Sequence, residues 1–556
     1  MRLRKTVFGA LGLCLLAALV PQARAADDVV MRALRDELAR SMKELQLEKL
    51  DKPYFISYRV QDRAQLGTSA TFGALLAGSV SRSRYLIVQV RVGDYQRDNS
   101  NFFTFPVRAN GLSETAALPL DDDYQELRRQ IWLATDEAYK EALETLAKKR
   151  AALENRTTRE DLPDFSHEEP TTVQEPEAPA KLDLDRAQNL VRSLSSLFRQ
   201  QPEIYSSTVS LDLTDTRTWY LNSEGSVAMQ ESSTAGLVAG AETQAVEGML
   251  LPDWVSVSAR SMDDLPKEAD LAAQVRAMAE RLTQLRHAPL VDRYNGPVLF
   301  AGGAGAEIFS QVFAPKLLAM RPPASDNPQI EAYAAQNVSK FQDRIGARVL
   351  PGFLSVVDDP TQSSYQGSLL RGGHTVDDEG VRARPVKLVE KGILKTLLVT
   401  RDPVTRVPQS TGSFRIFGPQ PSNLVVSVEN GKSDAEMRSS LLDLIKQRGA
   451  EYGIIVRKVG REIAQVYPDG HEELARQGMF EGLDDAAFKD LVAASKDETV
   501  HTLPFAAVAG RIYPGQSGAP LVSFVVPSLL FEDLTLKPAS GELPTLPLSK
   551  HPFFDK

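Results

Sequence analysis

The sequence contains very little cysteine and histidine. Cys14 is the only cysteine in 556 residues, and there are six histidines. Because Cys14 lies in an apolar N-terminal run, removal of that run leaves a chain that can form no disulfide. The stability of the remaining chain must then come from burial of apolar side chains, and a chain of this length can supply it.

Long apolar runs are also missing beyond the N-terminus. Basic residues at positions 2, 4 and 5 precede the apolar run 7–20, and an Ala-Arg-Ala sequence ends at position 25. This is the pattern of a secretory signal peptide. We predict cleavage of residues 1–25 and export to the periplasm or out of the cell. No later run approaches the roughly 18 apolar residues of a membrane-spanning helix, so no transmembrane segment is expected.

An excess of positive charge is absent as well. The 64 Lys and Arg against 73 Asp and Glu give a net charge of −9. Binding to a nucleic acid requires clustered basic side chains that neutralise phosphates, so we expect no nucleic-acid partner. A hydrophobic fraction of 42% and a charged fraction of 25% are typical of globular proteins. The length exceeds the size at which one core keeps growing, which favours two domains.

Apolar periodicity predicts an α+β protein. We place an N-terminal α/β domain at residues 26–290 and a strand-rich C-terminal domain at residues 291–556. The expected helices cover residues 28–47, 123–153, 185–199, 267–286 and 433–448. The expected strands include residues 54–60, 85–92, 207–213, 218–222, 248–251, 297–300, 454–456 and 522–526, with a hairpin over residues 381–400 and a turn plus a further strand over residues 67–83.

A segment rich in proline and glutamate interrupts the first domain. Residues 159–180 lack apolar periodicity, so we predict an extended loop rather than packed structure. His167, Glu168 and Glu169 lie within it. Three adjacent ligands in a flexible loop are not preorganised for one ion, so we expect no metal site there.

Segments in the second half resemble the TldD/PmbA family, whose members have been described as metalloproteases and as modulators of DNA gyrase. The resemblance covers about residues 295–550, and the sequence Asp-Asp-Glu-Gly at residues 377–380 is its most specific piece. The similar segments are GPVLFAGGAGAEIFSQVFAPKL (296–317), residues 372–402, STGSFR (410–415), PSNLVV (421–426) and VVPSLLFEDLTL (525–536). The resemblance implies a two-domain fold, a closed dimer that encloses a chamber, and peptides or unfolded protein as substrate.

The zinc motif of this family is absent from the matching helix. The zinc-bearing subunit of the family carries HExxxH there, together with a distant cysteine, and its glutamate activates water. By position, the matching residues here are Ser310, Gln311 and Pro315, and none of them is a zinc ligand. The resemblance implies zinc as the family's cofactor, but this sequence lacks zinc ligands at the matching positions. The chain resembles the PmbA-like type, which implies a homodimer or a heterodimer with a zinc-bearing TldD-like paralogue.

Two other candidate sites stay open. His374 precedes Asp377, Asp378 and Glu379, and carboxylates with one imidazole suit a harder ion such as Mn²⁺ or Ca²⁺. Acidic residues in turns also cap the backbone, which explains the same sequence without a metal. The sequence GQSGAP around Ser517 is similar to the nucleophile loop of trypsin-like serine proteases. Ser517 would then be the nucleophile, with His374 as its base and Asp378 as the orienting carboxylate.

The sequence thus predicts an exported, metallopeptidase-like protein that acts as the zinc-ligand-free subunit of a peptidase complex. An active hydrolase with a non-standard metal or serine site is one alternative. A non-catalytic exported binding protein is another, because a fold does not dictate a function.

Overall fold

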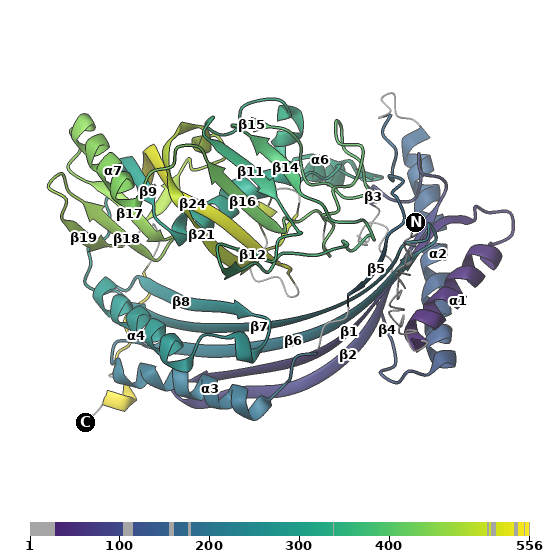
Figure 1. Ribbon diagram of the computed structural model, residues 1–556, viewed down its shortest axis with the longest axis horizontal. Helices are drawn as coiled ribbons and strands as arrows, with labels where there is room; N and C mark the ends of the chain where they lie inside the picture. The colour runs from purple at the N-terminus through teal and green to yellow at the C-terminus, as the bar shows by residue number, and fades with distance from the viewer. Residues whose placement is uncertain are drawn as a thin grey trace, which may run out of the picture.

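The computed structural model describes residues 28–103, 115–154, 161–175, 179–336, 338–416, 418–476, 478–508, 511–512, 519–538, 543–549 and 551–554. These residues form two large sheets that lie one above the other, with helices on their outer sides (Figure 1). The predicted signal peptide lies outside the described residues. Within those ranges, no helix is long and apolar enough to cross a membrane.

The N-terminal sheet is long and curved, and its concave face is turned toward the second sheet (Figure 1). Its strands follow the order β4-β2-β1-β6-β7-β5, and β8 also pairs with β7. All neighbours are antiparallel except β5 and β7. The strands are β1 (Pro53–Thr71), β2 (Ala74–Val92), β4 (Thr115–Ala117), β5 (Thr172–Glu175), β6 (Ser206–Asn222), β7 (Val227–Gln244) and β8 (Leu250–Ala259).

Several of these strands are longer than the sequence pattern predicted. Residues 67–83 do not form a separate strand but continue β1 and β2, which are joined by a turn at Phe72 and Gly73. The strands expected at 207–213 and 218–222 are one strand, β6, and β7 was not predicted. Polar residues alternate with apolar ones over these stretches. Pairing with neighbours, more than intrinsic propensity, stabilises such strands.

Four helices cover the convex side of this sheet in two groups. Tyr58 and Val60 of β1 pack beneath α1 (Val29–Glu44) and α2 (Tyr124–Glu154). Leu211 and Leu237 pack beneath α3 (Leu184–Ser196) and α4 (Glu268–Leu285). Burial of one such side chain stabilises the fold by about 1.5–3 kcal/mol. The four helices lie within a few residues of their predicted ranges.

The described part of the predicted acidic loop has no helix or strand over residues 161–171, as expected, but several of its side chains are buried, so the predicted lack of packing was wrong. Phe165 and Ser166 are 1% and 3% exposed, and Thr172–Glu175 forms strand β5. The Phe165 ring meets the ring of Phe55 edge-on at 5.0 Å between centroids. His167 lies against Tyr95. Individual contacts hold this segment between the two halves of the chain, and such contacts leave no periodicity in the sequence.

The C-terminal sheet is mixed, with the order β15-β14-β11-β16-β24-β9-β17-β18-β19, and β20 and β21 also pair with β24. Its core is the largest apolar cluster of the described residues. The strands are β9 (Tyr294–Phe300), β11 (Leu354–Asp358), β14 (Val386–Glu390), β15 (Ile393–Leu394), β16 (Asn423–Val428), β17 (Gly453–Lys458), β18 (Glu462–Val466), β19 (Glu472–Ala475), β20 (Met479–Glu481), β21 (Leu491–Pro504) and β24 (Leu521–Lys537).

Short elements complete the C-terminal half. Helix α7 (Asp434–Arg448) begins with a capping box formed by Ser433 and Glu436, close to its predicted start. Strands β3 (Phe102–Phe103) and β10 (Ala324–Ser325) pair in parallel and connect the two halves. The other short elements are α5 (Gly303–Ile308), α6 (Pro328–Gln336), β12 (Ser364–Tyr365), β13 (Ser368–Leu369), β22 (Ala507–Val508) and β23 (Arg511–Ile512).

The end of the chain returns to the N-terminal sheet. The Gln244 side-chain amide donates a hydrogen bond to the carbonyl of Pro544 at 3.4 Å. The ring of Phe553 lies 5.5 Å from that of Phe72, at the turn between β1 and β2. The last described residues therefore contact the opposite half of the molecule from β24.

Candidate functional site

The glycine turn after β9 places a short helix against the C-terminal sheet. Gly302 has a φ of +53°, which leads the chain from β9 into α5. A Cβ at Gly305 would lie 2.3 Å from the carbonyl oxygen of Pro527, so only glycine permits this close approach of α5 to β24. A π-helical turn over Phe309–Phe313 and a 3₁₀ turn over Ala314–Leu317 follow.

The residues that the resemblance predicts at the family's metal positions, Ser310, Gln311 and Pro315, lie on these turns, and their chemistry does not fit zinc. The buried Ser310 hydroxyl donates a hydrogen bond to the carbonyl of Glu307 at 2.8 Å. Gln311 is exposed, and Pro315 is buried and has no side-chain donor atom. Structural and catalytic zinc sites use Cys, His, Asp or Glu. Across the described ranges, no three such side chains are grouped so that they could hold a metal ion.

The Glu307 carboxylate is engaged by neighbouring groups. One oxygen pairs with Arg461, and the other accepts a hydrogen bond from the Val459 amide at 2.7 Å. Arg461 also lies over the Trp254 ring at 3.8 Å and contacts Asp253 at 3.3 Å. Asp253 accepts further hydrogen bonds from Lys458 and Arg281, each at 2.9 Å. This cluster, which we call the Glu307 cluster, connects α5 to β8 of the N-terminal sheet.

His501 on β21 lies beside the Glu307 cluster, and the sequence analysis did not single it out. Burial lowers the pKa of His501; the charge of Glu307 opposes this shift and that of Arg461 reinforces it. The imidazole is therefore neutral at neutral pH. Glu307 and His501 are distant in sequence, and only the pairing of β24 with both β9 and β21 brings them together. No local spacing could have indicated this neighbour.

The Asp-Asp-Glu-Gly turn is held by backbone donors. One oxygen of Asp377 accepts hydrogen bonds from the amides of Glu379 and Val381, both at 2.9 Å. Its other oxygen accepts one from Phe414 at 3.1 Å. Burial raises the pKa of Asp377 to about 7. These contacts are those of a residue that fixes a turn.

The same turn contacts the N-terminal sheet. Asp378 lies 2.5 Å from Arg59, and the Tyr220 hydroxyl donates a hydrogen bond to the carbonyl of Glu379 at 2.7 Å. Burial opposes ionisation of Asp378, but the charges of Arg59 and Arg415 outweigh it and hold its pKa below the ordinary value. Burial, with the nearby Asp402 and Asp377, raises the pKa of Glu379 to about 8. The turn therefore joins the two halves of the chain.

Both ring nitrogens of His374 are engaged. Nε2 lies 3.0 Å from the carbonyl oxygen of Gly412, and Nδ1 lies 3.2 Å from the guanidinium of Arg415. Arginine can only donate, so Nδ1 accepts and the Nε2 proton is donated to Gly412. Burial and the charge of Arg415 lower the pKa of His374 to about 4. The cations beside this turn, Arg59 and Arg415, disfavour binding of a divalent ion there. Ser517, the predicted nucleophile, lies outside the described residues.

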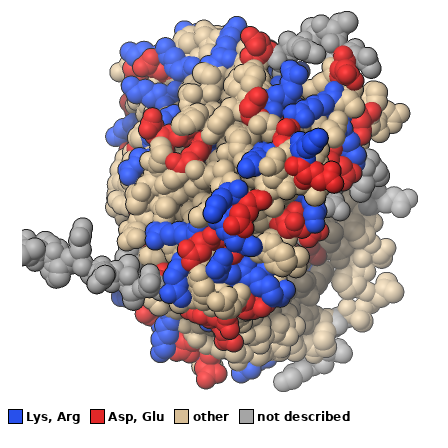
Figure 2. All heavy atoms as spheres, turned by 90° about the vertical axis from the view of Figure 1, so that its right-hand side faces the viewer, with Lys and Arg blue, Asp and Glu red and all other residues tan. Residues whose placement is uncertain are grey.

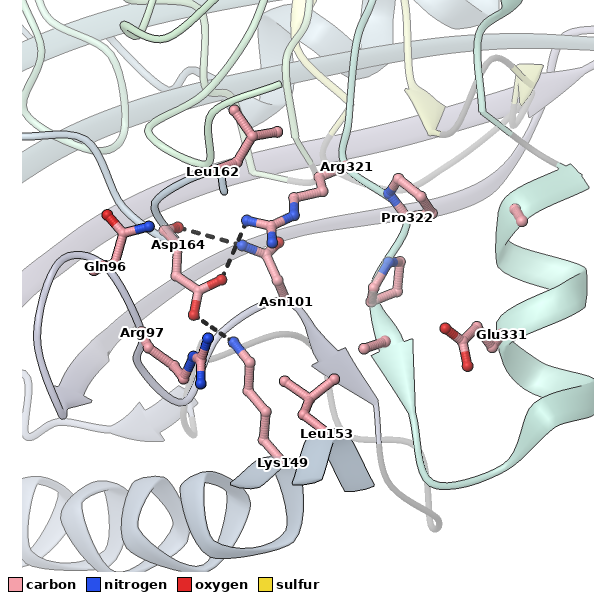
Figure 3. A pocket seen from close by; sticks show the side chains of 13 residues that line it. Gln96, Arg97, Asn101, Lys149, Leu153, Leu162, Asp164, Arg321, Pro322 and Glu331 are labelled. Carbon is pink, nitrogen blue, oxygen red and sulfur yellow. Dashed lines mark hydrogen bonds and ion pairs between the residues drawn. The ribbon is translucent and has the colours of Figure 1, made fainter. Parts of the chain in front are cut away.

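A cavity of about 410 Å³ lies where the two halves meet near the end of α2 (Figure 3). Asp164 on its wall accepts hydrogen bonds from Lys149 at 2.5 Å and Arg321 at 3.2 Å. Burial lowers the pKa of Lys149 although Asp164 opposes the shift. Arg97 points toward Lys149 in this view. The Asp164 carboxylate already has strong partners, so this wall joins the two halves and offers no free acid.

Comparison with known proteins places the C-terminal half in a defined class. Residues 294–537 match the profile of the PmbA/TldA metallopeptidase C-terminal domain. An 84-residue stretch is 38% identical to a metalloprotease of Methanocaldococcus jannaschii; it spans 15% of this chain and 18% of that protein.

Solved structures share the fold over most of the chain. TldE from Thermococcus kodakarensis has a TM-score of 0.56 at 15% identity, with 92% of this chain and 100% of that chain covered. A protein from Thermotoga maritima, named as a proposed modulator of DNA gyrase, has a TM-score of 0.57 at 15% identity, with 86% and 95% covered. A Bacteroides thetaiotaomicron protein of the same description has a TM-score of 0.58 at 12% identity, with 92% and 98% covered.

The fold and the matched domain define an α+β protein of the metallopeptidase type. More particularly, the chain belongs to the TldD/PmbA family. Its resemblance to that family and its α+β fold class are both confirmed.

Proposed function

We propose that this chain is the zinc-ligand-free, PmbA-like subunit of an exported peptidase complex. In this role it binds peptide or unfolded protein and does not itself cleave it. A zinc-bearing TldD-like paralogue supplies the catalytic ion and the water-activating glutamate. The N-terminal signal pattern supports export.

The chemistry at the metal positions carries this proposal. A zinc peptidase needs ligands on the helix after the glycine turn and a carboxylate that is free to take a proton from water. Here Ser310, Gln311 and Pro315 occupy those positions, and the Glu307 carboxylate is engaged by Arg461 and the Val459 amide. The side chains of this chain therefore supply no zinc chemistry of their own.

The distribution of charge supports the expectation that the partner is not a nucleic acid. Figure 2 shows acidic and basic side chains intermingled on the face formed by α1 and α2, without a large basic area. The net charge of −9 has the same implication.

The first test is the metal content of the mature protein by elemental mass spectrometry after extensive dialysis. We expect zinc far below one equivalent per chain. Near-stoichiometric zinc would overturn the proposal and direct attention to His501 and Glu307, or to His374 and the acidic turn.

A second test addresses the partner. The tagged chain is purified from its native envelope fraction, and the co-purifying proteins are identified. We expect an exported paralogue with intact HExxxH, and peptide hydrolysis only when both chains are present. Hydrolysis by this chain alone, in the presence of a chelator, would favour a serine hydrolase instead.

A further inference from the structure

The cavity near the end of α2 has more cations than anions on its wall. Its charged side chains are Arg97, Lys149 and Arg321 against Asp164 and Glu331. The chain as a whole carries a net charge of −9, so a local excess of positive charge sets this cavity apart. Asp164 is shared between Lys149 and Arg321, and one carboxylate does not neutralise two cations. A cavity lined in this way attracts anions.

The second acid of the cavity lies away from the cations. Glu331 belongs to α6 and lies across the cavity from Arg97 and Lys149 (Figure 3). Its side chain also has interactions of its own. Its charge therefore leaves the end of the cavity at Lys149 positive.

Two of the cations have donors to spare. The Lys149 ammonium is buried and carries three N–H groups. The Ser100 carbonyl accepts one at 2.6 Å and Asp164 accepts a second at 2.5 Å. Over the residues that the structure describes, the third N–H has no acceptor, and the exposed Arg97 guanidinium makes no hydrogen bond or ion pair. Arg97 points toward Lys149 (Figure 3), and two like charges placed in this way repel unless an anion lies between them.

The rest of the cavity wall is largely aliphatic. Leu153, Leu162 and Pro322 line it, and none of its described lining residues is aromatic. Such a wall suits a short hydrocarbon body and offers no ring on which the base of a nucleotide would stack. The volume of about 410 Å³ lies within the range of about 300–1,000 Å³ that is usual for small-molecule sites. Junctions between domains are a common place for such sites.

We propose that this cavity binds a small organic carboxylate with a short aliphatic body. The carboxylate lies between Arg97 and Lys149 and accepts charge-assisted hydrogen bonds from both, while the aliphatic body lies against the leucines. A free carboxylic acid and the C-terminal carboxylate of a peptide present the same chemistry. The wall is formed by both halves of the chain, so a bound carboxylate stabilises their junction. Neither zinc nor a partner chain takes part, so this inference goes beyond the proposed function.

Isothermal titration calorimetry on the full mature chain tests this proposal. The probe is isocaproate, and its neutral amide, isocaproamide, is the matched ligand. We expect saturable binding of one isocaproate per chain. The amide should bind at least about tenfold more weakly, the factor that corresponds to one hydrogen bond between charged groups. Acetate should also bind more weakly than isocaproate, because it lacks the aliphatic body.

Two arginine variants locate the site. Arg97→Gln removes the exposed cation of the cavity and should weaken isocaproate binding at least about tenfold. Arg150→Gln is the matched control and should leave the affinity unchanged. Arg150 follows Lys149 on α2 but does not line the cavity; it pairs with Asp51 at 2.9 Å, and its side chain is 55% exposed. Both arginines are exposed, so both variants should fold, which circular dichroism verifies.

Several results would overturn the assignment. These are no saturable heat with isocaproate, equal affinities for the acid and the amide, and equal affinities of the wild type and Arg97→Gln. Tighter binding of inorganic phosphate than of isocaproate would also overturn it, because phosphate makes no use of the aliphatic wall. An acetylated tripeptide that ends in leucine, with a free C-terminus, distinguishes the two sources. Tighter binding of this peptide than of isocaproate identifies a peptide C-terminus as the ligand, and weaker binding identifies a free acid. The zinc content, which tests the proposed function, has no bearing on these results.

Discussion

Replacement of Arg401 by methionine should destabilise the junction between the two halves of the chain strongly. Arg401 is 1% exposed, and its guanidinium makes two hydrogen bonds to Glu224 at 2.7 and 2.8 Å. Its Nε donates a hydrogen bond to the carbonyl of Ser166 at 3.1 Å, and the cation lies 3.8 Å from the centre of the Phe165 ring. One side chain thus ties the C-terminal half to β6, β7 and the packed segment after α2.

The expected magnitude follows from what the substitution leaves behind. Glu224 has a side chain that is 8% exposed and would keep a buried charge without its cation. Loss of one partner of a buried ion pair costs about 3–5 kcal/mol. We expect a comparable drop in the free energy of unfolding for Arg401→Met. The double variant Arg401→Met with Glu224→Gln should lose less, because the orphan charge is gone. Arg401→Lys should fall between wild type and Arg401→Met, since lysine keeps the charge but not the paired geometry.

Urea denaturation and hydrogen exchange together measure this effect. A chain of this size can unfold in more than one step, so the free energy is taken from the first transition. Exchange of amides in residues 161–175 should rise in Arg401→Met more than exchange in α7, which is remote from the junction. A loss below about 1 kcal/mol, the level of an exposed ion pair, would refute the reasoning. Equal losses in the single and double variants would show that the orphan charge does not dominate.

Three further substitutions test the acidic turn and its surroundings. Gly380→Ala should lower the free energy of unfolding by about 2–5 kcal/mol, because two penalties add: alanine in a left-handed backbone conformation and overpacking. Gly380 has a φ of +79°, and the new Cβ would lie 2.2 Å from the Tyr220 ring. Gly346→Ala is the matched control, with a φ of +91° and open space around it, so it should lose only the stability that the strained backbone accounts for. Equal melting temperatures of the two variants would contradict the packing argument. Glu379 has a pKa raised from 4.5 to about 8, so the folded chain keeps a proton that the unfolded chain releases, and stability falls as pH rises through this window. Glu379→Gln should flatten that fall in urea midpoints measured at both ends of the window. His374 has a pKa lowered from 6.5 to about 4, so stability falls as pH drops through that window. If His374→Gln loses the same stability over that pH range, another group is responsible.

Local pattern was sufficient for the helices and for the most apolar strands. Asp28 caps α1 as a short acceptor before an apolar repeat, and Ser433 and Glu436 mark the start of α7. Such signals act within a few residues, so a sequence carries them in full. The hydroxyl-rich parts of β1, β2 and β6 have weak local signals, and β7 gives almost none. Their pairing with neighbours far along the chain makes them strands.

Some features of the candidate site could likewise be predicted from the sequence, and others arise only on folding. Residue types alone determined that Ser310, Gln311 and Pro315 cannot ligate zinc, because ligand chemistry depends on the atoms a side chain carries. The resemblance to the TldD/PmbA family was likewise readable from motifs within short segments. The position of His501 beside Glu307 was not, nor was the engagement of both His374 nitrogens, because each depends on strands or loops that meet only after folding.

The sequence by itself determined the resemblance to the family, the fold class and the helices, since each depends on composition or on neighbours a few residues apart. Only the tertiary structure decided that the acidic segment is packed through Phe165 and that Arg401 joins the two halves. It also decided that the concave face of the N-terminal sheet meets the C-terminal half through Tyr220 and Trp254. These features arise between residues hundreds of positions apart, whose meeting is set by the free energy of the whole packed chain and not by any local preference.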